Sequence, residues 1–426
     1  MTICLHNARL LTLASPAPAA DRRGTRTGDL GIIEHGWVRI RNGSITEVGT
    51  GDAPEPRTHA QLTERRIDCR GRVLMPSFTD CHTHLCWAGE RLDEWEAKLA
   101  GASYLDILRA GGGILATVRA VRAASQAQLT EHLAQRLDWL LREGTTTVEI
   151  KSGYGLDTQT ELKMLRAIAE ADHHWQGTIV PTACIGHAID PEAADDHDRA
   201  AFIRRTIDET LPAVTAEFPG VAIDAYCEEG AWSREACLEL FDRALATGHP
   251  VRVHADQFHA LGLLPEAVAR GYTSVDHLEA TGPDDLALLA EAAETFGVML
   301  PCSGFHTDGR YADGRAFLDA GGRLAIATNT NPGSSPCQSM PMAIALAARF
   351  NGLTAAEAIA CATATPADLL GLADRGRLEP GCRADMVLLR AADERTLAFE
   401  FGGNPIDMVF CRGELAAINE AVGCWC

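Results

Sequence analysis

Lysine is nearly absent from this chain of 426 residues, in which Lys98, Lys151 and Lys163 are the only three. Arginine carries almost all of the positive charge, and the acidic residues outnumber the basic ones, so that the formal net charge is −20. Nucleic acids and anionic membrane surfaces bind proteins through basic patches, and the charge therefore argues against both as partners. A small anionic substrate is still compatible with this charge, because a single well-placed arginine sets the local field.

Long apolar runs are also missing. No run reaches the roughly 18 residues that would suggest a membrane-spanning helix. Residues 1–13 include His6, Asn7 and Arg9, and they are too polar for the apolar region of a signal peptide. The fourteen cysteines include no Cys-x-x-Cys pair. Scattered cysteines without a secretory signal are typical of a reducing compartment, so we expect a cytoplasmic location.

The most informative short motif is His82-Thr83-His84, which follows an apolar run bounded by Pro76. The run predicts a strand, and residues two apart on a strand point to the same side. Both imidazoles would then face one way at the spacing of metal ligands. Taken alone, the motif is explained equally well by two unrelated histidines in a turn. The residues elsewhere in the chain distinguish this explanation from a metal site.

Seven further strand-like segments follow, and most of them end in polar residues. They cover residues 145–154, 178–187, 221–229, 250–254, 273–277, 297–302 and 324–329. The polar residues at their ends include His187, the pair Glu228 and Glu229, His254, His277 and Asn329. In parallel α/β folds, catalytic groups collect at these carboxyl ends of strands. Four histidine-bearing strand ends therefore favour a metal-dependent enzyme.

Stretches with helical periodicity lie between these strands, at residues 130–142, 160–171, 233–247 and 283–294 among others. Eight alternations of strand and helix predict an α/β protein built on a (β/α)8 TIM barrel, which we place at residues 76–378.

The two ends of the chain have a different pattern. Residues 37–48 alternate around the turn signal Asn42-Gly43, as a β-hairpin does, and residues 384–390 and 408–413 also look like short strands. We therefore expect residues 1–75 and 379–426 to form one small β-sandwich domain together.

At this point the residues resemble a known family. The order His82-x-His84, His187, His254, His277 and position 329 is similar to the amidohydrolase superfamily, and a larger set of motifs resembles its imidazolonepropionase family. These motifs are Asp80-Cys-His-Thr-His84, Ala88-Gly-Glu-Arg91, Ala110-Gly-Gly-Gly113, Thr117-Val-Arg119, Lys151-Ser-Gly-Tyr-Gly-Leu156, His254-Ala-Asp-Gln257, Asp276-His-Leu278 and Asn331-Pro-Gly-Ser334. They span the chain, and the Lys-Ser-Gly-Tyr-Gly and Asn-Pro-Gly blocks are not general amidohydrolase signals.

The resemblance implies an activity and a cofactor. The activity is hydrolysis of the cyclic amide of 4-imidazolone-5-propanoate to N-formimidoyl-L-glutamate in histidine degradation, by a hydroxide bound to one zinc or iron ion. Related barrel hydrolases with two metals often bridge them with a carboxylated lysine on a central strand. The only strand lysine here, Lys151, lies on the second strand of the barrel, so we expect one ion.

The resemblance also assigns roles by position. The metal ligands are His82, His84, His254 and Asn329. The substrate-binding residues are Arg91, Tyr154, His187, Gln257, Asn331, Gly333 and Ser334. The catalytic positions are His277, Asn329 and Gln257. Arg91 suits the propionate arm of the substrate, because a guanidinium grips a carboxylate through two parallel hydrogen bonds.

Position 329 departs from the family pattern, which usually has aspartate there. Asn329 can offer a carbonyl oxygen to a metal but cannot accept a proton at neutral pH. The loss of a carboxylate lowers the pKa of bound water, while the loss of a base costs about 10²–10⁴-fold in rate. His277 is the neighbouring group best suited to replace that base, and Glu228 and Glu229 qualify only if their strand end faces the metal.

Three functions fit these residues. The first is an imidazolonepropionase with an altered proton path, the second is a related cyclic-amide hydrolase or ring deaminase, and the third is a catalytically impaired homologue that only binds the ligand. Turnover and metal content would separate the third from the others, and a panel of substrates would separate the second from the first. The sequence leaves the oligomeric state open, a homodimer included.

Overall fold

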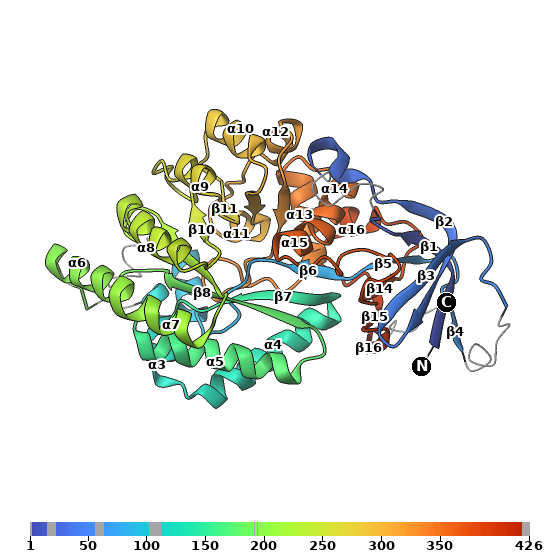
Figure 1. Ribbon diagram of the computed structural model, residues 1–426, viewed down its shortest axis with the longest axis horizontal. Helices are drawn as coiled ribbons and strands as arrows, with labels where there is room; N and C mark the ends of the chain where they lie inside the picture. Colours follow the sequence, from blue (N-terminus) through green and yellow to red (C-terminus); the bar gives the residue numbers. More distant parts are fainter. Residues whose placement is uncertain are drawn as a thin grey trace.

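The computed structural model describes residues 2–14, 23–55, 64–101, 112–190, 192–193 and 195–419. The chain forms two eight-stranded sheets, one inside a ring of helices and one built from the two chain ends (Figure 1). The start of the Ala110–Gly113 motif and the last seven residues lie outside the described parts. Among the described helices, none is long and apolar enough to cross a bilayer.

The first sheet has eight parallel strands in sequential order, from β6 to β13. Their bounds are β6 Phe78–Asp80, β7 Thr145–Lys151, β8 Thr178–Gly186, β9 Ala222–Cys227, β10 Arg252–Ala255, β11 Ser274–His277, β12 Phe296–Met299 and β13 Leu324–Ile326. Each coincides with one of the eight predicted strand segments, and the predicted (β/α)8 barrel is confirmed.

The barrel closes just beyond the carboxyl ends of its first and last strands. The backbone N–H of Asn329 donates to the carbonyl of His82 at 3.0 Å, and the N–H of His84 donates to the carbonyl of Thr330 at 2.9 Å. These bonds join the segment after β13 to the segment after β6. The closing segments therefore include the predicted metal ligands.

Helices cover the outside of the barrel. Their bounds are α1 Leu92–Leu99, α3 Ile114–Ala123, α4 Gln126–Arg142, α5 Thr158–His174, α6 Asp196–Arg205, α7 Leu211–Glu217, α8 Arg234–Ala246, α9 Leu264–Arg270, α10 Pro283–Glu291, α11 Pro301–His306, α12 Gly314–Asp319, α13 Met340–Phe350, α14 Ala355–Cys361, α15 Ala364–Leu369 and α16 Thr396–Phe399. Short segments of 3-10 and π-helix, η2 Gly24–Gly28 and η3 Thr206–Thr210, complete the helical part.

Helix α4 illustrates how the sequence sets these elements. Ser125 and Gln128 form a capping box at its start, in which each side chain binds the other residue's backbone N–H. Leu129, Leu133 and Leu137 recur every four residues and are fully buried. This apolar face packs against the barrel, and α4, α5, α8 and α10 correspond to the four helical stretches named from the sequence.

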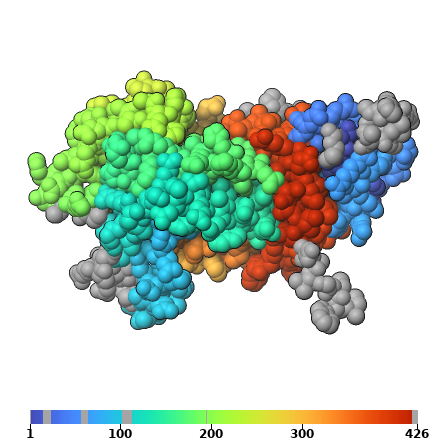
Figure 2. All heavy atoms as spheres, turned by 90° about the horizontal axis from the view of Figure 1, so that it is seen from below, coloured from blue at the N-terminus to red at the C-terminus, as the bar shows by residue number. Residues whose placement is uncertain are grey.

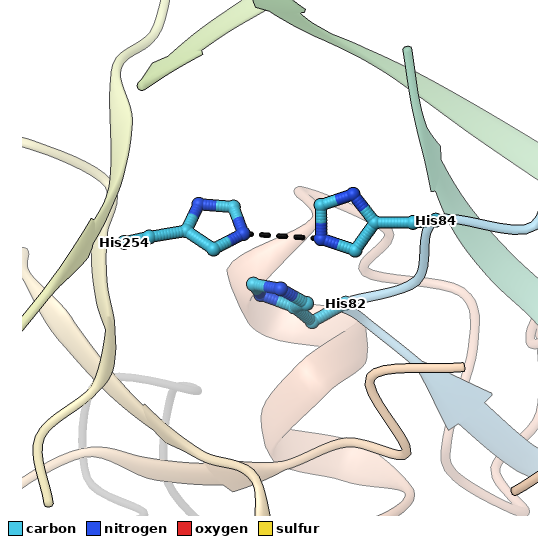
Figure 3. A group of neighbouring side chains, drawn as sticks. All are labelled: His82, His84 and His254. Carbon is cyan, nitrogen blue, oxygen red and sulfur yellow. Dashed lines mark hydrogen bonds between the residues drawn. The ribbon is translucent and has the colours of Figure 1, made fainter. Parts of the chain in front are cut away.

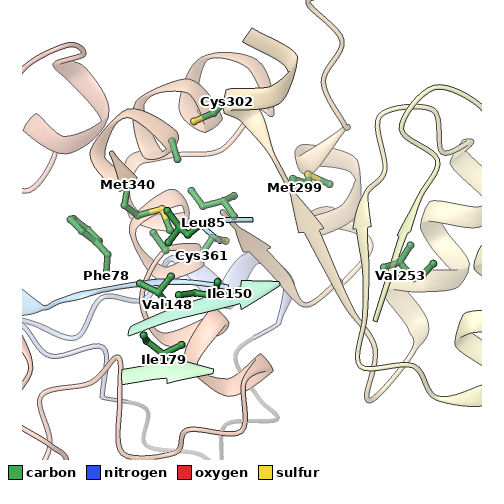
Figure 4. Close-up of a cluster of buried hydrophobic side chains, with 14 of the residues drawn as sticks. Phe78, Leu85, Val148, Ile150, Ile179, Val253, Met299, Cys302, Met340 and Cys361 are labelled. Carbon is green, nitrogen blue, oxygen red and sulfur yellow. The ribbon is translucent and has the colours of Figure 1, made fainter. Parts of the chain in front are cut away.

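Strand alternation divides the barrel into an outer apolar layer and a polar interior. On β7, Val148 and Ile150 are fully buried in the main hydrophobic cluster, with Phe78 and Met340 nearby (Figure 4). Glu149 and Lys151 alternate with them and point to the other side of the sheet, where Lys151 reaches Asp224 on β9. The barrel interior therefore contains charged residues.

The second sheet has the order β16-β15-β14-β5-β1-β2-β3, with β4 paired to β1. Its bounds are β1 Thr2–Leu11, β2 Ile32–Arg41, β3 Ser44–Thr50, β4 Arg65–Asp68, β5 Val73–Pro76, β14 Met386–Leu389, β15 Ile406–Cys411 and β16 Glu414–Ile418. The C-terminal segment lies between the barrel and the N-terminal strands (Figure 2). A sheet made from both termini is thus confirmed, while the boundaries 1–75, 76–378 and 379–426 stay a prediction.

This sheet curls over its own core. The N–H of Ile45 at the start of β3 donates to the carbonyl of Cys382 at 2.8 Å, and the N–H of Ala384 donates to Gly43 at 2.9 Å. The predicted hairpin turn is present: Asn42 and Gly43 have φ values of 51° and 83°. Two successive positive φ angles match the twist of a tight hairpin, which explains why Asn-Gly occurs there.

Candidate metal centre

Three histidine side chains meet at the carboxyl end of the barrel (Figure 3). The Nε2 atoms of His84 and His254 lie 3.1 Å apart, and the ring of His82 lies 4.5 Å from that of His254 between centroids. All three residues are at most 3% exposed. The ligand atoms of the three residues lie within 4.8 Å of one another, which is the clustering that a single metal ion requires.

The His82-Thr83-His84 motif lies just beyond its strand. Strand β6 ends at Asp80, although the motif was expected on the strand itself. Backbone hydrogen bonds hold this segment: Lys151 N–H donates to the Thr83 carbonyl, and the closing bonds hold the residues on either side. Thr83 Oγ1 donates to the carbonyl of Glu149, away from the cluster in which His82 and His84 meet.

Hydrogen bonds to carboxylates determine how two of the rings are protonated. His82 Nδ1 lies 2.6 Å from Asp276 Oδ2, and His254 Nδ1 lies 3.0 Å from Asp224 Oδ1. An ionised carboxylate only accepts, so each Nδ1 carries the hydrogen and each Nε2 keeps its lone pair. Burial lowers the pKa of His82, His84 and His254 below the usual range, which keeps the rings neutral.

Asn329 adds an oxygen to this neighbourhood. Its Nδ2 donates to Ser303 Oγ at 2.8 Å, and its Oδ1 is buried without a hydrogen-bond partner. Its φ of 53° lies in the left-handed region, which asparagine tolerates better than most residues. His82 Nε2 is likewise buried without a partner. A buried imidazole nitrogen and a buried amide oxygen left unpaired at one site are the donors that a divalent cation satisfies.

His277 stands beside the three histidines at the end of β11. Its ring centroid lies 5.6 Å from that of His254 and 6.0 Å from that of His82. Its Nδ1 lies 3.2 Å from Glu279 Oε1, so the ring can be held in one orientation by this carboxylate. His277 and Leu278 both have positive φ, at 93° and 73°, and strain of this kind persists where the surrounding structure imposes it.

His187 and Tyr154 extend the site on the other side of His84. The rings of His187 and His84 are stacked at 4.6 Å, and Tyr154 lies 5.1 Å from His187 between centroids. His187 Nδ1 lies 3.0 Å from the carbonyl of Gly153, to which it must donate. Burial, with a further contribution from His254, lowers the pKa of His187 to about 3. The ring is therefore neutral, with an acceptor at Nε2.

Arg91 lies next to the loop that follows β13. A Cβ atom placed on Gly333 would stand 3.2 Å from Arg91 Nη1, so only glycine leaves that space free. The guanidinium also forms an ion pair with Glu94 and a long hydrogen bond, 3.4 Å, to Thr117 Oγ1. Its Nε is buried without a partner. Arg91 therefore keeps hydrogen-bonding capacity that its protein neighbours do not use.

Asn331 builds the loop in which Gly333 and Ser334 lie. Its Oδ1 accepts from the N–H groups of Gly333 and Ser334, at 2.8 and 2.7 Å. Its Nδ2 donates to the carbonyl of Asn329 and to Ser334 Oγ. The side chain was expected to line the pocket, and the structure shows that its polar atoms are occupied in shaping the loop.

Gln257 is connected to the histidines through a tyrosine. Tyr226 donates to Gln257 Oε1 at 2.7 Å, and the tyrosine ring lies 6.0 Å from His254 between centroids. The acidic pair after β9 is directed elsewhere. Glu228 accepts from the N–H groups of Phe258 and His259. It thereby holds the loop after β10 in place and is not a substitute for the missing aspartate.

Several residues of the site were given no role from the sequence, although Thr117 and Asp276 belong to the motifs that carry the resemblance. They are Asp224, Asp276, Glu149 and Arg252 beneath the histidines, Ser303 beside Asn329, and Thr117 and Glu94 beside Arg91. A signal was present for the interior group, because charged residues two positions apart in an apolar strand point into the barrel. Lys151, which begins one of those motifs and indicated a single metal ion, has its Nζ 2.8 Å from both Glu149 and Asp224.

Comparison with known proteins agrees with this geometry. Residues 73–416 match the model of the amidohydrolase family, so the barrel with its histidine cluster belongs to that class of metal-dependent hydrolases. The solved structures give the same architecture. A 5-methylcytosine deaminase from Klebsiella pneumoniae superimposes with a TM-score of 0.72 at 16% identity, covering 99% of this chain and 98% of that one. Guanine deaminase from E. coli superimposes with a TM-score of 0.71 at 15% identity, covering 99% and 100%. At these identities the likeness concerns the fold alone.

The curated relatives show which family of amidohydrolases the chain belongs to. The imidazolonepropionase of Herpetosiphon aurantiacus is 43% identical over 412 residues, which cover 95% of each chain. That of Deinococcus radiodurans is 43% identical over 401 residues, which cover 94% of this chain and 96% of the relative. The chain belongs to the imidazolonepropionase family.

Proposed function

We propose that this protein hydrolyses the cyclic amide of 4-imidazolone-5-propanoate to N-formimidoyl-L-glutamate, a step of histidine degradation. The observation that carries the proposal is the contact of Tyr154 and His187 with the three-histidine cluster, together with Arg91 beside the loop that follows β13. A carboxylate-binding cation and two ring-binding aromatic groups at one site suit a planar ring with a carboxylate arm. The full-length similarity to relatives named imidazolonepropionase supports the same substrate.

One divalent ion, zinc or iron, is the proposed cofactor. His82, His84 and His254 would hold it through their Nε2 atoms, and the unpaired Oδ1 of Asn329 would be the fourth ligand. Neutral nitrogen and amide oxygen donors suit either metal. When bound, such an ion activates water near neutral pH and polarises a carbonyl oxygen.

Arg91 binds the propionate carboxylate in this proposal. Its partner Glu94 also accepts from the N–H of Gly113, which restricts how far the guanidinium can turn. His187 accepts a ring N–H of the substrate at Nε2, because its Nδ1 hydrogen is already committed to Gly153. Tyr154 packs beside it and offers its hydroxyl to the ring.

His277 handles the proton that an aspartate at position 329 would have taken. Its Nδ1 faces Glu279, so its Nε2 is the atom that can accept a proton from water and return it to the departing ring nitrogen. Gln257, held by Tyr226, contacts the substrate and takes no part in proton transfer, because an amide does not titrate.

The partner implied is a small anionic molecule. The net charge of −20 supports neither a nucleic acid nor an anionic membrane surface as a partner, and a homodimer is compatible with it. We also propose a cytoplasmic location. The free thiols of the cysteines in the described residues are typical of a reducing compartment.

The test combines metal analysis with turnover of imidazolone propionate generated from urocanate. The purified protein should contain about one zinc or iron ion per chain, and it should consume this substrate faster than other cyclic amides or aminated rings. His254→Ala should remove both metal and activity, whereas His174→Ala, on an exposed turn of α5, should keep both. A metal-loaded protein that deaminates other rings and leaves imidazolone propionate untouched would overturn the proposal.

A further inference from the structure

Five charged side chains fill the barrel interior beneath the three histidines. They are Glu149 and Lys151 of β7, Asp224 of β9, Arg252 of β10 and Asp276 of β11, and we call them the interior charge network. All are at most 2% exposed. The strand pattern explains their position, because Arg252 and His254 are two residues apart on β10 and point the same way.

The network is continuous from strand to strand. Lys151 Nζ lies 2.8 Å from Glu149 Oε1 and 2.8 Å from Asp224 Oδ2. Arg252 Nη2 lies 2.8 Å from Asp276 Oδ2, and its Nη1 lies 3.2 Å from Glu149 Oε1. Each carboxylate that accepts from a histidine is therefore also bound to a cation, and Glu149 links the two cations.

Glu149 also connects the network to the loop of the other histidines. Its Oε2 accepts from the backbone N–H of Thr83 at 3.2 Å, and its carbonyl accepts from Thr83 Oγ1 at 2.6 Å. Thr83 lies between His82 and His84. The network thus contacts the supports of all three histidines.

The pairing matters because it fixes the two carboxylates in place. Lys151 holds Asp224 Oδ2, while Asp224 Oδ1 lies 3.0 Å from His254 Nδ1. Arg252 holds Asp276 Oδ2, which also lies 2.6 Å from His82 Nδ1. A carboxylate that lost its cation could turn away from the ring, and the imidazole would then lose the contact that sets its orientation.

We propose that Lys151 and Arg252 are positioning residues of the metal centre. Their ion pairs hold Asp224 and Asp276 where each carboxylate contacts Nδ1 of His254 or His82, so that both rings keep Nε2 toward the ion. This inference rests on the metal centre of the proposed function. It adds that the interior charge network holds the histidines in position before the ion binds. The network holds three carboxylates against two cations. Its surplus negative charge lies close to a site whose fourth donor, Asn329, is neutral, and it offsets part of the charge of a divalent ion.

A purely structural role is the alternative, since buried ion pairs can also stabilise a fold. A matched control exists on the other sheet. Arg39 of β2 is 2% exposed and forms ion pairs with Glu64 and Glu47, remote from the histidines. Loss of Arg39 should lower stability in the same way without any effect on metal affinity.

The experiment compares Lys151→Met, Arg252→Met and Arg39→Met with the wild-type protein. Each folded, metal-depleted protein is titrated with Co²⁺ against a chelator, and the visible absorption of the bound ion reports its coordination. We expect the dissociation constant to rise about 10–100-fold in the Lys151 and Arg252 variants, with an altered spectrum, and to stay within about twofold in Arg39→Met. Unchanged affinity and spectrum in the first two variants would overturn the positioning role.

A second pair of variants covers the case in which the methionine variants fail to fold. Asp224→Asn and Asp276→Asn keep the volume of the side chain and remove its charge, and they should also raise the dissociation constant about tenfold or more. If both bind Co²⁺ as the wild type does, the proposal is wrong. A wild-type protein that binds no divalent ion would instead overturn the metal centre itself, so the two failures can be told apart.

Discussion

The amide Nδ2 of Asn329 donates to the hydroxyl oxygen of Ser303 at 2.8 Å, and this bond fixes which end of the amide is left for another partner. With Nδ2 engaged, Oδ1 is the free atom, and it is buried without a partner. An asparagine that replaces an aspartate near a metal has to be held in one of its two orientations. Ser303, at the start of α11, supplies that constraint.

Ser303→Ala should therefore weaken metal binding. Without the acceptor at Ser303, the amide of Asn329 can turn its NH₂ group toward the ion, and we expect a loss of about 0.5–1.5 kcal/mol, the usual net worth of one hydrogen bond. In the Asn329→Asp background, where the two oxygens are equivalent, the same change should matter less. Metal titration of the four proteins in this cycle measures the coupling, and equal losses in both backgrounds would refute it. Ser339→Ala, at the N-cap of α13, is the control.

Asn329→Asp should keep the fold, since the two side chains are nearly isosteric. The carboxylate should hold the metal at least as tightly as the amide does, because it offsets the charge of the ion. If the missing base limits the rate, kcat should rise by up to about 10²-fold, the scale of one acid–base group. A fall in kcat would mean that the neutral Asn329 favours the reaction, because it lowers the pKa of the bound water. An inactive wild type that this change activates would favour the ligand-binding homologue.

His277→Ala should abolish hydrolysis and leave the metal in place. The ring lies beside the three-histidine cluster but is not part of it, so its loss removes a proton acceptor and no proposed ligand. We expect kcat to fall by about 10²–10⁴-fold. Metal content and kcat are measured on the same preparation, and loss of the metal would show that His277 is a ligand.

Replacement of Arg91 should weaken the binding of the substrate. Arg91→Ala removes the proposed partner of the propionate arm and should cost roughly 2–5 kcal/mol, whereas Arg91→Lys keeps the charge and should cost less. Ring analogues without the arm should inhibit the wild type poorly and should inhibit Arg91→Ala about equally well. Equal inhibition of the wild type by analogues with and without the arm would contradict this assignment.

The metal-free protein should lose stability as the pH falls below about 6.5, the ordinary pKa of histidine. Burial lowers the pKa of His82 and His84, so these rings are neutral in the folded protein and take up protons in the unfolded chain. Stability increases with pH wherever the unfolded state binds more protons, so this contribution is complete above pH 6.5 and is lost as the pH falls. Urea midpoints between pH 8 and pH 5 measure the slope, which should be shallower in the double variant His82→Gln/His84→Gln.

The fold could be predicted from the sequence because it follows from the order of strands and helices, which local residue patterns indicate. Eight apolar segments bounded by turns, separated by helices with an apolar face, leave few arrangements other than a barrel. The polar residues at the ends of the segments then had to meet at one face of the barrel, and the structure brings His82, His84 and His254 together there. The sheet from the two termini followed from the hairpin at Asn42-Gly43 and from the short strands near the C-terminus.

The supports of the site could not be predicted in the same way, because they depend on contacts between distant parts of the chain. Asp224 pairs with His254 and Lys151 across the barrel, and each of the three lies on a different strand. Ser303 lies after β12, in a segment whose end carries neither a histidine nor a carboxylate, and its role depends on the orientation of a single amide. Asn331 was assigned to substrate binding by the resemblance, and only its hydrogen bonds show that it also shapes the loop.

The bonds that close the barrel imply an order of events during synthesis. His82 and His84 emerge early from the ribosome, but the groups that clamp their backbone, at Asn329 and Thr330, emerge about 250 residues later. A nascent chain that stops short of Thr330 has the histidines and lacks the closure that orients them. We therefore expect metal capture at the last stage of folding: ribosome-bound chains truncated before β13 should not retain the ion, whereas the released full-length protein should.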